Sequence, residues 1–481
     1  MVVASVASLL GCRTSQPGGS GGPPRVEPNV APPESAADLQ AGVAFFDDST
    51  MHQVRLWMSN DDFTSIIQDT RGDDMRTATF SIDGVVMANV GVRPSGESSR
   101  VPGNQKMSMR IQFDAFDMGK KMGGVDEIKL SGSWDDPFIV RDRLAYWVYR
   151  QVMPAPRETA AQVWVNGEPR GVFEIEEVWG KEALASRFSD PSGPMYRLRG
   201  LTNTDPYAYN GDDPVAYVPL PWDPVGRSLV DPAVDAVIAP ALALVAQGAD
   251  HLGDAMDVDT LLTYFAASAI LSNTDGFTGP FEVDDHYQYR DPTTGKFFIL
   301  PWDPDNTFGS INDSPEADIF LNYERCVITR MIAGGPLQEQ FFAKLEDVMN
   351  RVPADAIKGQ ADAIVGQISA AVGYDKTKMY PTDSFVWSLG YVKDWIDGRY
   401  ASIPTQIATK RAAGTNTGTG GATGTNTGTG GTSGTGTGTA GTTGTDTGTG
   451  GTSGAGTGTA GTIGTDTGTG GTTGTGSGGA P

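Results

Sequence analysis

FFILPWDPD, residues 297–305, is an apolar run that ends abruptly in two carboxylates. Phe297 to Leu300 predicts a short buried strand. Pro301 and the residues after it end this strand, because proline has no backbone N–H to donate to a sheet. Asp303 and Asp305 therefore follow the strand directly, in the loop that leaves the sheet.

The preceding segment shows the same pattern, an apolar element followed by an acidic loop. Residues 258–272 predict a buried helix that ends at the loop holding Asp275, and Asp284 and Asp285 come shortly afterwards. Carboxylates on loops suit Mg²⁺, which keeps several waters and bridges phosphate oxygens. A carboxylate near a nucleophile also orients a hydroxyl and accepts its proton. The alternatives are plain acidic surface loops or calcium, but the run from Asp303 lacks the glycine and glutamate of an EF-hand.

The first third of the folded part predicts strands. Residues 78–93 alternate apolar and polar side chains around an Asp-Gly turn, and residues 107–113 alternate again. A second hairpin is expected over residues 162–175, around an Asn-Gly turn. Between the hairpins, Asp136 is a candidate helix N-cap and Pro137 suits the first helical turn.

The second half is more helical, with amphipathic helices expected at residues 337–352 and 385–396. A strand-rich part with one helix, followed by a helical part, is the order of a two-lobed protein-kinase-like fold. We therefore predict the α+β class, although other α+β folds share this order.

A loop rich in glycine and serine lies between two predicted strands, at residues 90–100. Its backbone amides and hydroxyls are free to approach phosphate oxygens. Lys106, at the start of the next strand, can reach phosphates as a point charge. The alternative is an ordinary polar loop with a solvated lysine.

Several motifs in this order resemble the CotH kinase family over residues 42–412. The matching stretches are Asn89 to Arg93 with Gly96 to Ser99, Lys106 to Phe113, Asp136-Pro137 with Arg141-Asp142 and Leu144-Ala145, Val165 to Glu168 with Gly171 to Phe173, and Tyr287 to Pro292 with Ile299 to Asp305. The family is described as an atypical protein kinase that transfers the γ-phosphate of ATP to Ser or Thr of coat or surface proteins. The resemblance implies ATP and Mg²⁺ as cofactors, a strand-rich N-lobe and a helical C-lobe.

The resemblance also implies roles for particular residues. These are Gly96, Ser98 and Ser99 in a phosphate-covering loop, Lys106 as the phosphate-binding lysine, Asp142 as its acidic partner on a helix that starts at Ile139, Glu177 or Glu176 near the connection between lobes, Asp275 as the catalytic carboxylate, and Asp303, Asp285 and Asp305 as metal ligands.

Three departures from the family pattern concern the same site. Asp285 or His286 stands where relatives carry an asparagine ligand, Asp142 is one methylene shorter than the usual glutamate, and Pro304 separates two carboxylates with its fixed φ. The alternative function is therefore a weak or inactive pseudokinase that serves as a surface adhesin or envelope scaffold.

The formal net charge is −23, from 35 Lys and Arg against 58 Asp and Glu. An acidic surface argues against nucleic acid or an anionic membrane as the main partner, because both are polyanions. The two cysteines, Cys12 and Cys326, form neither a disulfide framework nor a cysteine zinc site. We expect Cys326 to be a small packed residue.

The N-terminal segment resembles a targeting signal. Leu9-Leu10-Gly11-Cys12 resembles a bacterial lipobox, which predicts a signal peptide over residues 1–12 and a lipid anchor at Cys12. The alternative is a merely apolar terminus. A disordered linker rich in Pro, Gly and Ser is expected at residues 13–41. The protein is thus predicted to be extracytoplasmic, and to meet a membrane only through its anchor.

The C-terminal segment, residues 413–481, consists largely of Gly and Thr and repeats with a period of 20 residues. Such a segment has no side chains for a core, so we expect a disordered tail. A flexible spacer or glycosylated stalk is one interpretation of it. The other is that its threonines are substrates of the kinase domain itself.

Overall fold

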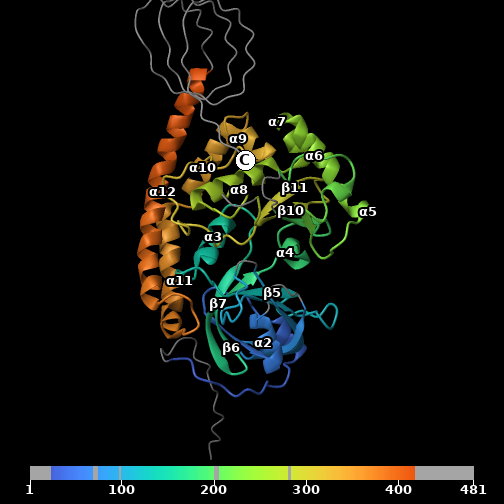
Figure 1. The fold of residues 1–481 in the computed structure, drawn as a ribbon, viewed down its shortest axis with the longest axis vertical. Helices are drawn as coiled ribbons and strands as arrows, with labels where there is room; N and C mark the ends of the chain where they lie inside the picture. Colours follow the sequence, from blue (N-terminus) through green and yellow to red (C-terminus); the bar gives the residue numbers. More distant parts are fainter. Residues whose placement is uncertain (1–22, 69–73, 97–98, 200–204, 280–282, 418–481) are drawn as a thin grey trace, which may run out of the picture. The chain divides into compact units, whose positions relative to one another are not determined.

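The computed structural model describes residues 23–68, 74–96, 99–199, 205–279 and 283–417, in which a strand-rich part precedes a helical part (Figure 1). The first part consists of α1 (Ala37–Ala41), β1 (His52–Trp57), α2 (Asn60–Gln68), β2 (Arg76–Ile82), β3 (Val85–Pro94), β4 (Met109–Gln112), β5 (Glu127–Ser131), α3 (Arg141–Arg150), β6 (Glu158–Val165) and β7 (Glu168–Glu177). Its strands close into a barrel in the order β1-β2-β3-β4-β5-β7-β6. The α+β class is therefore confirmed.

The second part begins after β7. It consists of α4 (Lys181–Ala185), β8 (Met195–Leu198), a short 3₁₀ helix η1 (Pro214–Ala216), β9 (Trp222–Pro224), α5 (Pro232–Asp235), α6 (Ile238–Gln247), α7 (Ala249–Ala255), α8 (Val258–Leu271), β10 (His286–Arg290), β11 (Phe297–Pro301), α9 (Val327–Ile332), α10 (Gln338–Arg351), α11 (Ala354–Tyr374) and α12 (Thr382–Thr417). A small sheet in the order β11-β10-β8-β9 lies among these helices.

Both predicted hairpins are confirmed, and their turns explain why they form. In the β2–β3 turn Asp83 and Gly84 have φ of 50° and 86°. In the β6–β7 turn Asn166 and Gly167 have φ of 53° and 80°. Positive φ at both central residues matches the right-handed twist of the paired strands, and Asp, Asn and Gly tolerate it best. The local sequence alone thus fixes these two strand pairs.

The predicted helix after Asp136 begins later than expected. The Asp136 carboxylate accepts hydrogen bonds from the backbone N–H of Phe138 and of Arg141, and it pairs with the Arg141 guanidinium. It therefore caps a turn in which Ile139 has a φ of 67°, and α3 starts only at Arg141. The predicted start at Ile139 is wrong, because that left-handed residue interrupts the helix.

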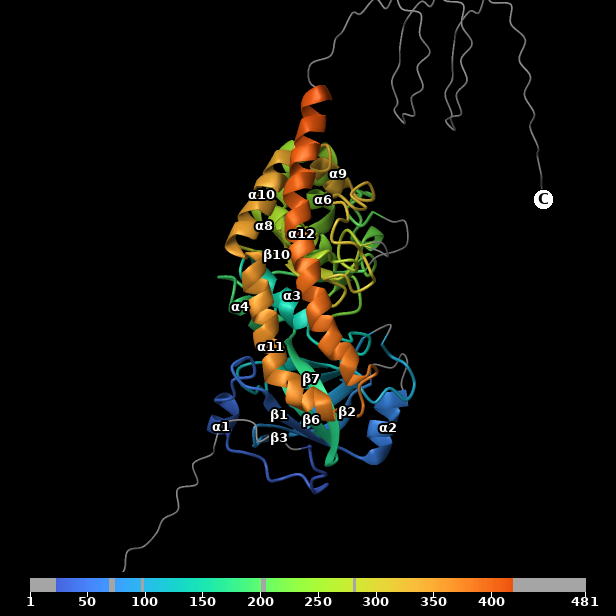
Figure 2. The same cartoon turned by 90° about the vertical axis from the view of Figure 1, so that its left-hand side faces the viewer.

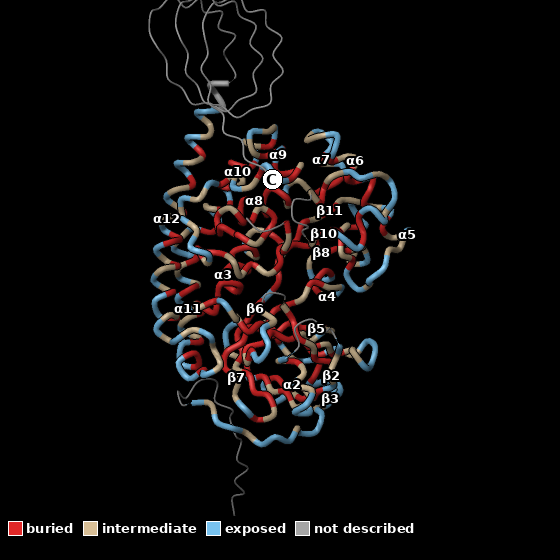
Figure 3. The backbone as a smooth tube through the Cα atoms, in the orientation of Figure 1, coloured by how far each residue is buried: buried red, intermediate tan, exposed pale blue. Residues whose placement is uncertain are grey.

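Helices α3 and α8 lie inside the molecule and are buried along most of their length (Figure 3). They stack against each other through Tyr149 and Tyr264, whose ring centroids are 6.0 Å apart. The barrel has its own core, in which Phe113 packs on Phe45 and Phe80. The predicted buried helix 258–272 is thus confirmed as α8, which packs against α3.

Helices α11 and α12 run beside both the barrel and the helical part (Figure 2). The predicted amphipathic helix at 385–396 is confirmed but covers only part of the N-terminal half of α12, and the helix predicted at 337–352 is α10. The loop between α11 and α12 is bonded to the barrel by a buried ion pair. In it the Lys106 ammonium lies 3.3 Å from an Asp375 oxygen, and both side chains are almost fully buried.

The Lys106–Asp375 ion pair, which we call the clamp, also explains why residue 171 is a glycine. Lys106 also donates to the Val172 carbonyl, while the Val172 N–H donates to Asp375 at 3.2 Å. Gly171 has a φ of 86°, and a Cβ atom there would lie 2.0 Å from the Asp375 carboxylate. A side chain at this position would therefore push the α11–α12 loop away from the barrel.

Part of the predicted linker belongs to the folded domain. In the described residues 23–41, the Glu27 N–H donates to the Gly167 carbonyl at 2.8 Å, and its carboxylate accepts two hydrogen bonds from Arg55. Ser35 donates its N–H to the Val86 carbonyl. The segment from residue 23 onward therefore packs on the barrel, and the prediction of a disordered linker was wrong for it.

Some predictions concern residues outside the described ranges. They are the lipobox with Cys12, Ser98 of the phosphate-covering loop, and the repeats of the C-terminal segment. Cys326 is described, and it is buried as predicted. In the described ranges no helix has both the length and the apolar character that crossing a membrane requires.

We expect Asp375→Ala to destabilise the domain by about 3–5 kcal/mol, because it leaves the Lys106 ammonium buried without its counter-charge. Urea unfolding followed by circular dichroism measures the change. Asp362→Ala is the matched control, since it breaks an exposed ion pair with Lys393 on the same helix pair. Equal stability of the two variants would contradict a structural role for the clamp.

Candidate functional site

A row of five charged residues crosses the barrel, one from each of five neighbouring strands. The ladder aligns them directly: β6 with β7, β7 with β5, β5 with β4, and β4 with β3. The residues of the row are, in order, Glu158, Glu176, Lys129, Arg110 and Arg93. Because directly opposed residues share one face of a sheet, the row presents two acids and three bases side by side.

Lys129 is the centre of this row. Its ammonium lies 2.8 Å from a Glu176 oxygen and 2.8 Å from an Asp303 oxygen. Burial opposes its charge, but Asp303 and Glu176 outweigh burial and raise the pKa of Lys129 well above its ordinary value. Tyr146 of α3 strengthens the junction, since its hydroxyl donates to Glu176 and accepts from the Asp303 N–H, each at 2.9 Å. The barrel, α3 and the loop after β11 therefore meet at this lysine.

The predicted acidic residues of the helical part lie around the same junction. Asp285 immediately precedes β10, and Asp303 lies two residues beyond the end of β11. Because His286 pairs with Pro301 in this hairpin, the two aspartates leave the sheet at the same end. Both have positive φ, 48° and 46°. Such a backbone is costly for a residue other than glycine and often marks a functional site.

Asp275 and Asp305 belong to this group as well. The Asn306 amide donates to Asp305 at 2.9 Å and to Asp275 at 3.3 Å, so one side chain holds both. Burial, Asp303 and Asp284 raise the pKa of Asp275 to about 6. Burial, assisted by Asp303, also raises the pKa of Asp285 well above its usual range. The structure thus brings Asp275, Asp285, Asp303 and Asp305 together as predicted.

Asp303 differs from its neighbours because the cation beside it outweighs the effect of burial on its pKa. Burial favours its neutral form, but Lys129 outweighs burial and lowers its pKa. Arg197 of β8 approaches Asp285 at 3.2 Å in the same way. The site therefore combines one firmly ionised aspartate with others that bind protons more readily than usual. Carboxylates that crowd together in this way favour a cation between them.

A cleft of about 780 Å³ opens beside the junction. It lies between the barrel and the β8–β10 sheet, and the link from β7 to α4 borders it. Arg93 and Arg110 line it from the barrel, and Arg197 lines it from the opposite side. Asp126, Glu127 and Asp223 line it too, and Glu127 pairs with both Arg93 and Arg110. The cleft therefore places three guanidinium groups, which suit a polyphosphate, beside three carboxylates.

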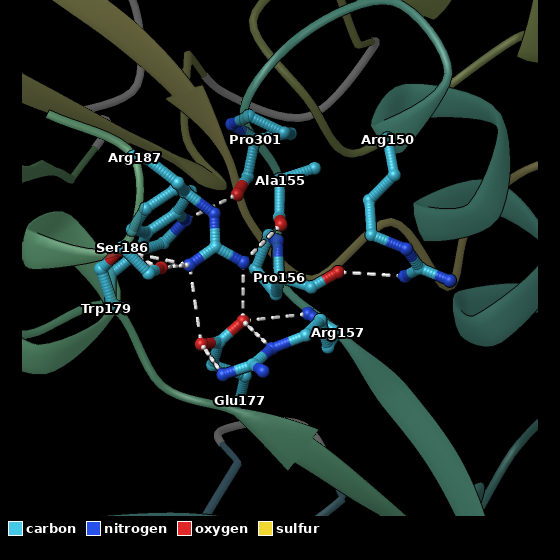
Figure 4. Close-up of polar contacts among 10 residues, drawn as sticks. Arg150, Ala155, Pro156, Arg157, Glu177, Trp179, Ser186, Arg187 and Pro301 are labelled. Carbon is cyan, nitrogen blue, oxygen red and sulfur yellow. Dashed lines mark hydrogen bonds and ion pairs between the residues drawn. The ribbon is translucent and has the colours of Figure 1, made fainter. Parts of the chain in front are cut away.

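Glu177 lies at the link between β7 and α4, as predicted, but its carboxylate is occupied. Figure 4 shows it between two arginines, with Arg157 at 2.7 Å and Arg187 also bonded to it. Arg187 also donates a hydrogen bond to the Ala155 carbonyl. Burial favours the neutral acid, yet hydrogen bonds from both arginines outweigh burial and lower the pKa of Glu177. This carboxylate therefore holds the chain together at the link.

The predicted pairing of Lys106 with Asp142 is wrong. Lys106 precedes β4 and turns into the interior, where Asp375 and the Val172 carbonyl bind its ammonium. Asp142 lies instead beside Glu158, Glu176 and Lys129. The lysine that meets the acidic loop is Lys129, one strand further along the barrel.

The glycine-rich loop is described at Gly96 and Ser99. Gly96 has a φ of 94°, and a Cβ atom there would lie 2.2 Å from the Ser99 hydroxyl oxygen. The Ser99 carbonyl accepts a hydrogen bond from Asn104. Among the described residues that line the cleft, Arg93 is the nearest in sequence to this loop. The predicted role of Gly96 and Ser99 in covering phosphates stays a prediction.

Sequence reasoning missed Lys129, Arg110 and Glu158. A local signal was present at residues 127–131, Glu-Ile-Lys-Leu-Ser, because polar and apolar side chains alternate there as in a strand. That pattern predicts a strand but not its neighbours. The alignment of Lys129 with Glu176 depends on how β5 pairs with β7, and this pairing joins residues far apart in the sequence.

Comparison with known protein families agrees with this arrangement. The family model described as "CotH kinase protein" matches residues 92–403, which include the barrel strands from β4 onward, the acidic loops and most of α12. The chain belongs to the CotH kinase family. The resemblance noted from the sequence motifs is thereby confirmed.

Two curated relatives of this CotH-family chain come from Bacillus subtilis (strain 168). "Inner spore coat protein H" is 24% identical over 265 residues, which cover 54% of this chain and 70% of the relative. "Inner spore coat protein H-like protein" is 28% identical over 109 residues, 22% of this chain and 33% of the relative. Among solved structures, the Helicobacter pylori proinflammatory kinase CtkA aligns with a TM-score of 0.32 and 8% identity, over 64% of this chain and 94% of that one.

We expect Glu177 to make the domain sensitive to acid. Because its folded-state pKa lies below its ordinary value of 4.5, its stabilising contribution is complete above that pH and is lost as the pH falls further. Between pH 5 and about pH 3, the free energy of unfolding should therefore fall less in Glu177→Gln than in the unaltered protein. Urea titrations at each pH measure this, with Glu168→Gln, exposed on the same strand, as control. Identical slopes in all three proteins would contradict the assignment.

Proposed function

We propose that this protein is an atypical protein kinase that transfers the γ-phosphate of ATP to Ser or Thr side chains of coat or envelope proteins. The observation that carries the proposal is the position of Lys129, whose ammonium joins Glu176 of the barrel to Asp303 of the acidic loop. A cation held between a strand-rich and a helical part, beside several carboxylates, is the arrangement of a kinase cleft.

The charges of the site fit a nucleoside triphosphate. Lys129 and the three arginines that line the cleft provide positive charge where the phosphates would lie, in an otherwise acidic protein. Asp285 and Asp303 offer carboxylate oxygens at one end of the β10–β11 hairpin. Mg²⁺ on these two residues, with Asp305 nearby, would neutralise charge that develops on the phosphate oxygens.

Asp275 is the proposed catalytic base. It orients the substrate hydroxyl and accepts its proton while the hydroxyl oxygen forms a bond to the γ-phosphorus. The bond from that phosphorus to the β–γ bridging oxygen breaks, and ADP leaves. Asn306, which donates to Asp275, holds the base in place. Lys129 and the cleft arginines stabilise the negative charge on the phosphate oxygens.

The proposed location follows the relatives and the N-terminal motif. The curated relatives are named as inner spore coat proteins, so we place this kinase at the cell envelope or surface. Cys12 is the proposed lipid attachment site. Its protein substrate is then a coat or envelope component that presents Ser or Thr.

We expect Lys129→Met to weaken ATP binding about 10–100-fold, since it removes a charge-assisted contact worth about 1.5–3 kcal/mol. Lys106→Met should lower stability but leave the ATP affinity of the folded protein unchanged, because Lys106 turns into the interior toward the α11–α12 loop, whereas Lys129 contacts the acidic loop. Isothermal titration calorimetry with ATP and Mg²⁺ measures both, with Lys393→Met as a surface control. Loss of affinity in Lys106→Met with normal binding in Lys129→Met would overturn the assignment.

Phosphate transfer should depend on an ionised Asp275. Since its pKa is raised to about 6, kcat/KM is expected to rise with pH through about 6 and then to level off. Asp275→Asn should lower the rate at least about 100-fold. Transfer of ³²P from γ-labelled ATP to the protein itself and to a generic Ser/Thr substrate measures the rate. ATP binding without any transfer by the unaltered protein would instead identify a pseudokinase.

A further inference from the structure

Behind Lys129, three buried carboxylates converge at one point. Glu158 and Glu176 are directly opposed on β6 and β7, and Asp142 approaches them from α3. One oxygen from each lies within 4.8 Å of the other two. The exposed fractions of Asp142, Glu158 and Glu176 are only 8%, 1% and 0%. Water therefore contributes little to the stability of their charges.

The carboxylates of this cluster differ in the polar partners that they have. Glu176 has the Lys129 ammonium at 2.8 Å and the Tyr146 hydroxyl at 2.9 Å. Glu158, by contrast, has no hydrogen-bond partner on either carboxylate oxygen anywhere in the described part of the chain. Opposed like charges destabilise a sheet, and a buried carboxylate without a partner is costlier still. The Glu158 side chain thus requires a group that it does not find among these residues.

The charge and spacing indicate what that group is. Three carboxylates meet here, and the single ammonium beside them is shared with Asp303, so a divalent cation would offset negative charge that these residues do not balance themselves. An all-carboxylate ligand set favours hard cations such as Ca²⁺, Mn²⁺ or Mg²⁺. Since Ca²⁺–oxygen distances are about 2.3–2.6 Å, oxygens on one Ca²⁺ lie at most about 5 Å apart, and the observed spacing is inside this limit.

We propose that Asp142, Glu158 and Glu176 form a binding site for one hard divalent cation, separate from the metal that would accompany ATP. The site ties α3 to β6 and β7, where the two strands would otherwise repel each other. It also sets the charge that Glu176 presents to Lys129, and so governs how this ammonium is shared with Asp303. The two sites are neighbours that use different residues, because Lys129 joins Glu176 of this cluster to Asp303 of the acidic loop.

The test uses the full-length protein, stripped with EDTA, in the absence of nucleotide. Equilibrium dialysis against Ca²⁺ or Mn²⁺, followed by elemental analysis, should find one ion retained per chain. At an ion concentration about 100-fold above Kd, Tm should rise by about 5 °C. Glu158→Gln and Asp142→Asn should each abolish both effects. Asp285→Asn, which alters only the proposed ATP-linked site, should retain the ion and the shift.

The Glu158→Gln variant remains informative in EDTA. Because it removes one buried negative charge, it should then melt at or above the temperature of the stripped wild-type protein. Absence of bound ion in the wild type would overturn the proposal. An unchanged ion content in Glu158→Gln, or loss of the ion only in Asp285→Asn, would overturn it as well. Failure of the kinase assay would leave these outcomes unaffected, so the two proposals are tested separately.

Discussion

The site depends on the burial of one ammonium group. Lys129 lies almost entirely out of solvent, so its charge persists only because two carboxylates from different parts of the molecule contact it. Breaking such a pair is costly, since it strands an uncompensated charge in a medium of low polarity. The β11 loop and the barrel are consequently held in one relative position, and Tyr146 of α3 is bonded to both.

The proposed ATP site is compatible with an acidic protein because basic side chains gather in one part of it. The excess of acids is not uniform, because the barrel row separates them from the bases. Glu158 and Glu176 lie at one end of the row, and Arg110 and Arg93 lie at the other end, beside the cleft. A triphosphate approaching the cleft would meet the basic end first. Glu158 and Glu176 are buried beyond Lys129, so the acids that a triphosphate would meet in the cleft are Asp126, Glu127 and Asp223.

Features that depend on neighbouring residues could be predicted from the sequence, whereas contacts between residues far apart in the sequence could not. The two hairpins were predictable because their turns need only two adjacent residues with positive φ. The grouping of Asp275, Asp285, Asp303 and Asp305 was expected because each lies on a loop beside an apolar element, and the family resemblance then suggested their roles. Lys106 was wrongly paired because its true partner, Asp375, is 269 residues away in the sequence. Lys129 was missed for the same kind of reason, since only strand pairing places it opposite Glu176.

The attachment of residues 23–41 to the barrel would limit how far the barrel can lie from a membrane. If Cys12 carries the anchor, ten residues, Arg13 to Gly22, separate it from the first residue that the structure describes. Even fully stretched, ten residues span at most about 36 Å, which is comparable to the thickness of a lipid bilayer. A domain anchored in this way would stay next to the bilayer, and it would reach only proteins at or close to the membrane surface.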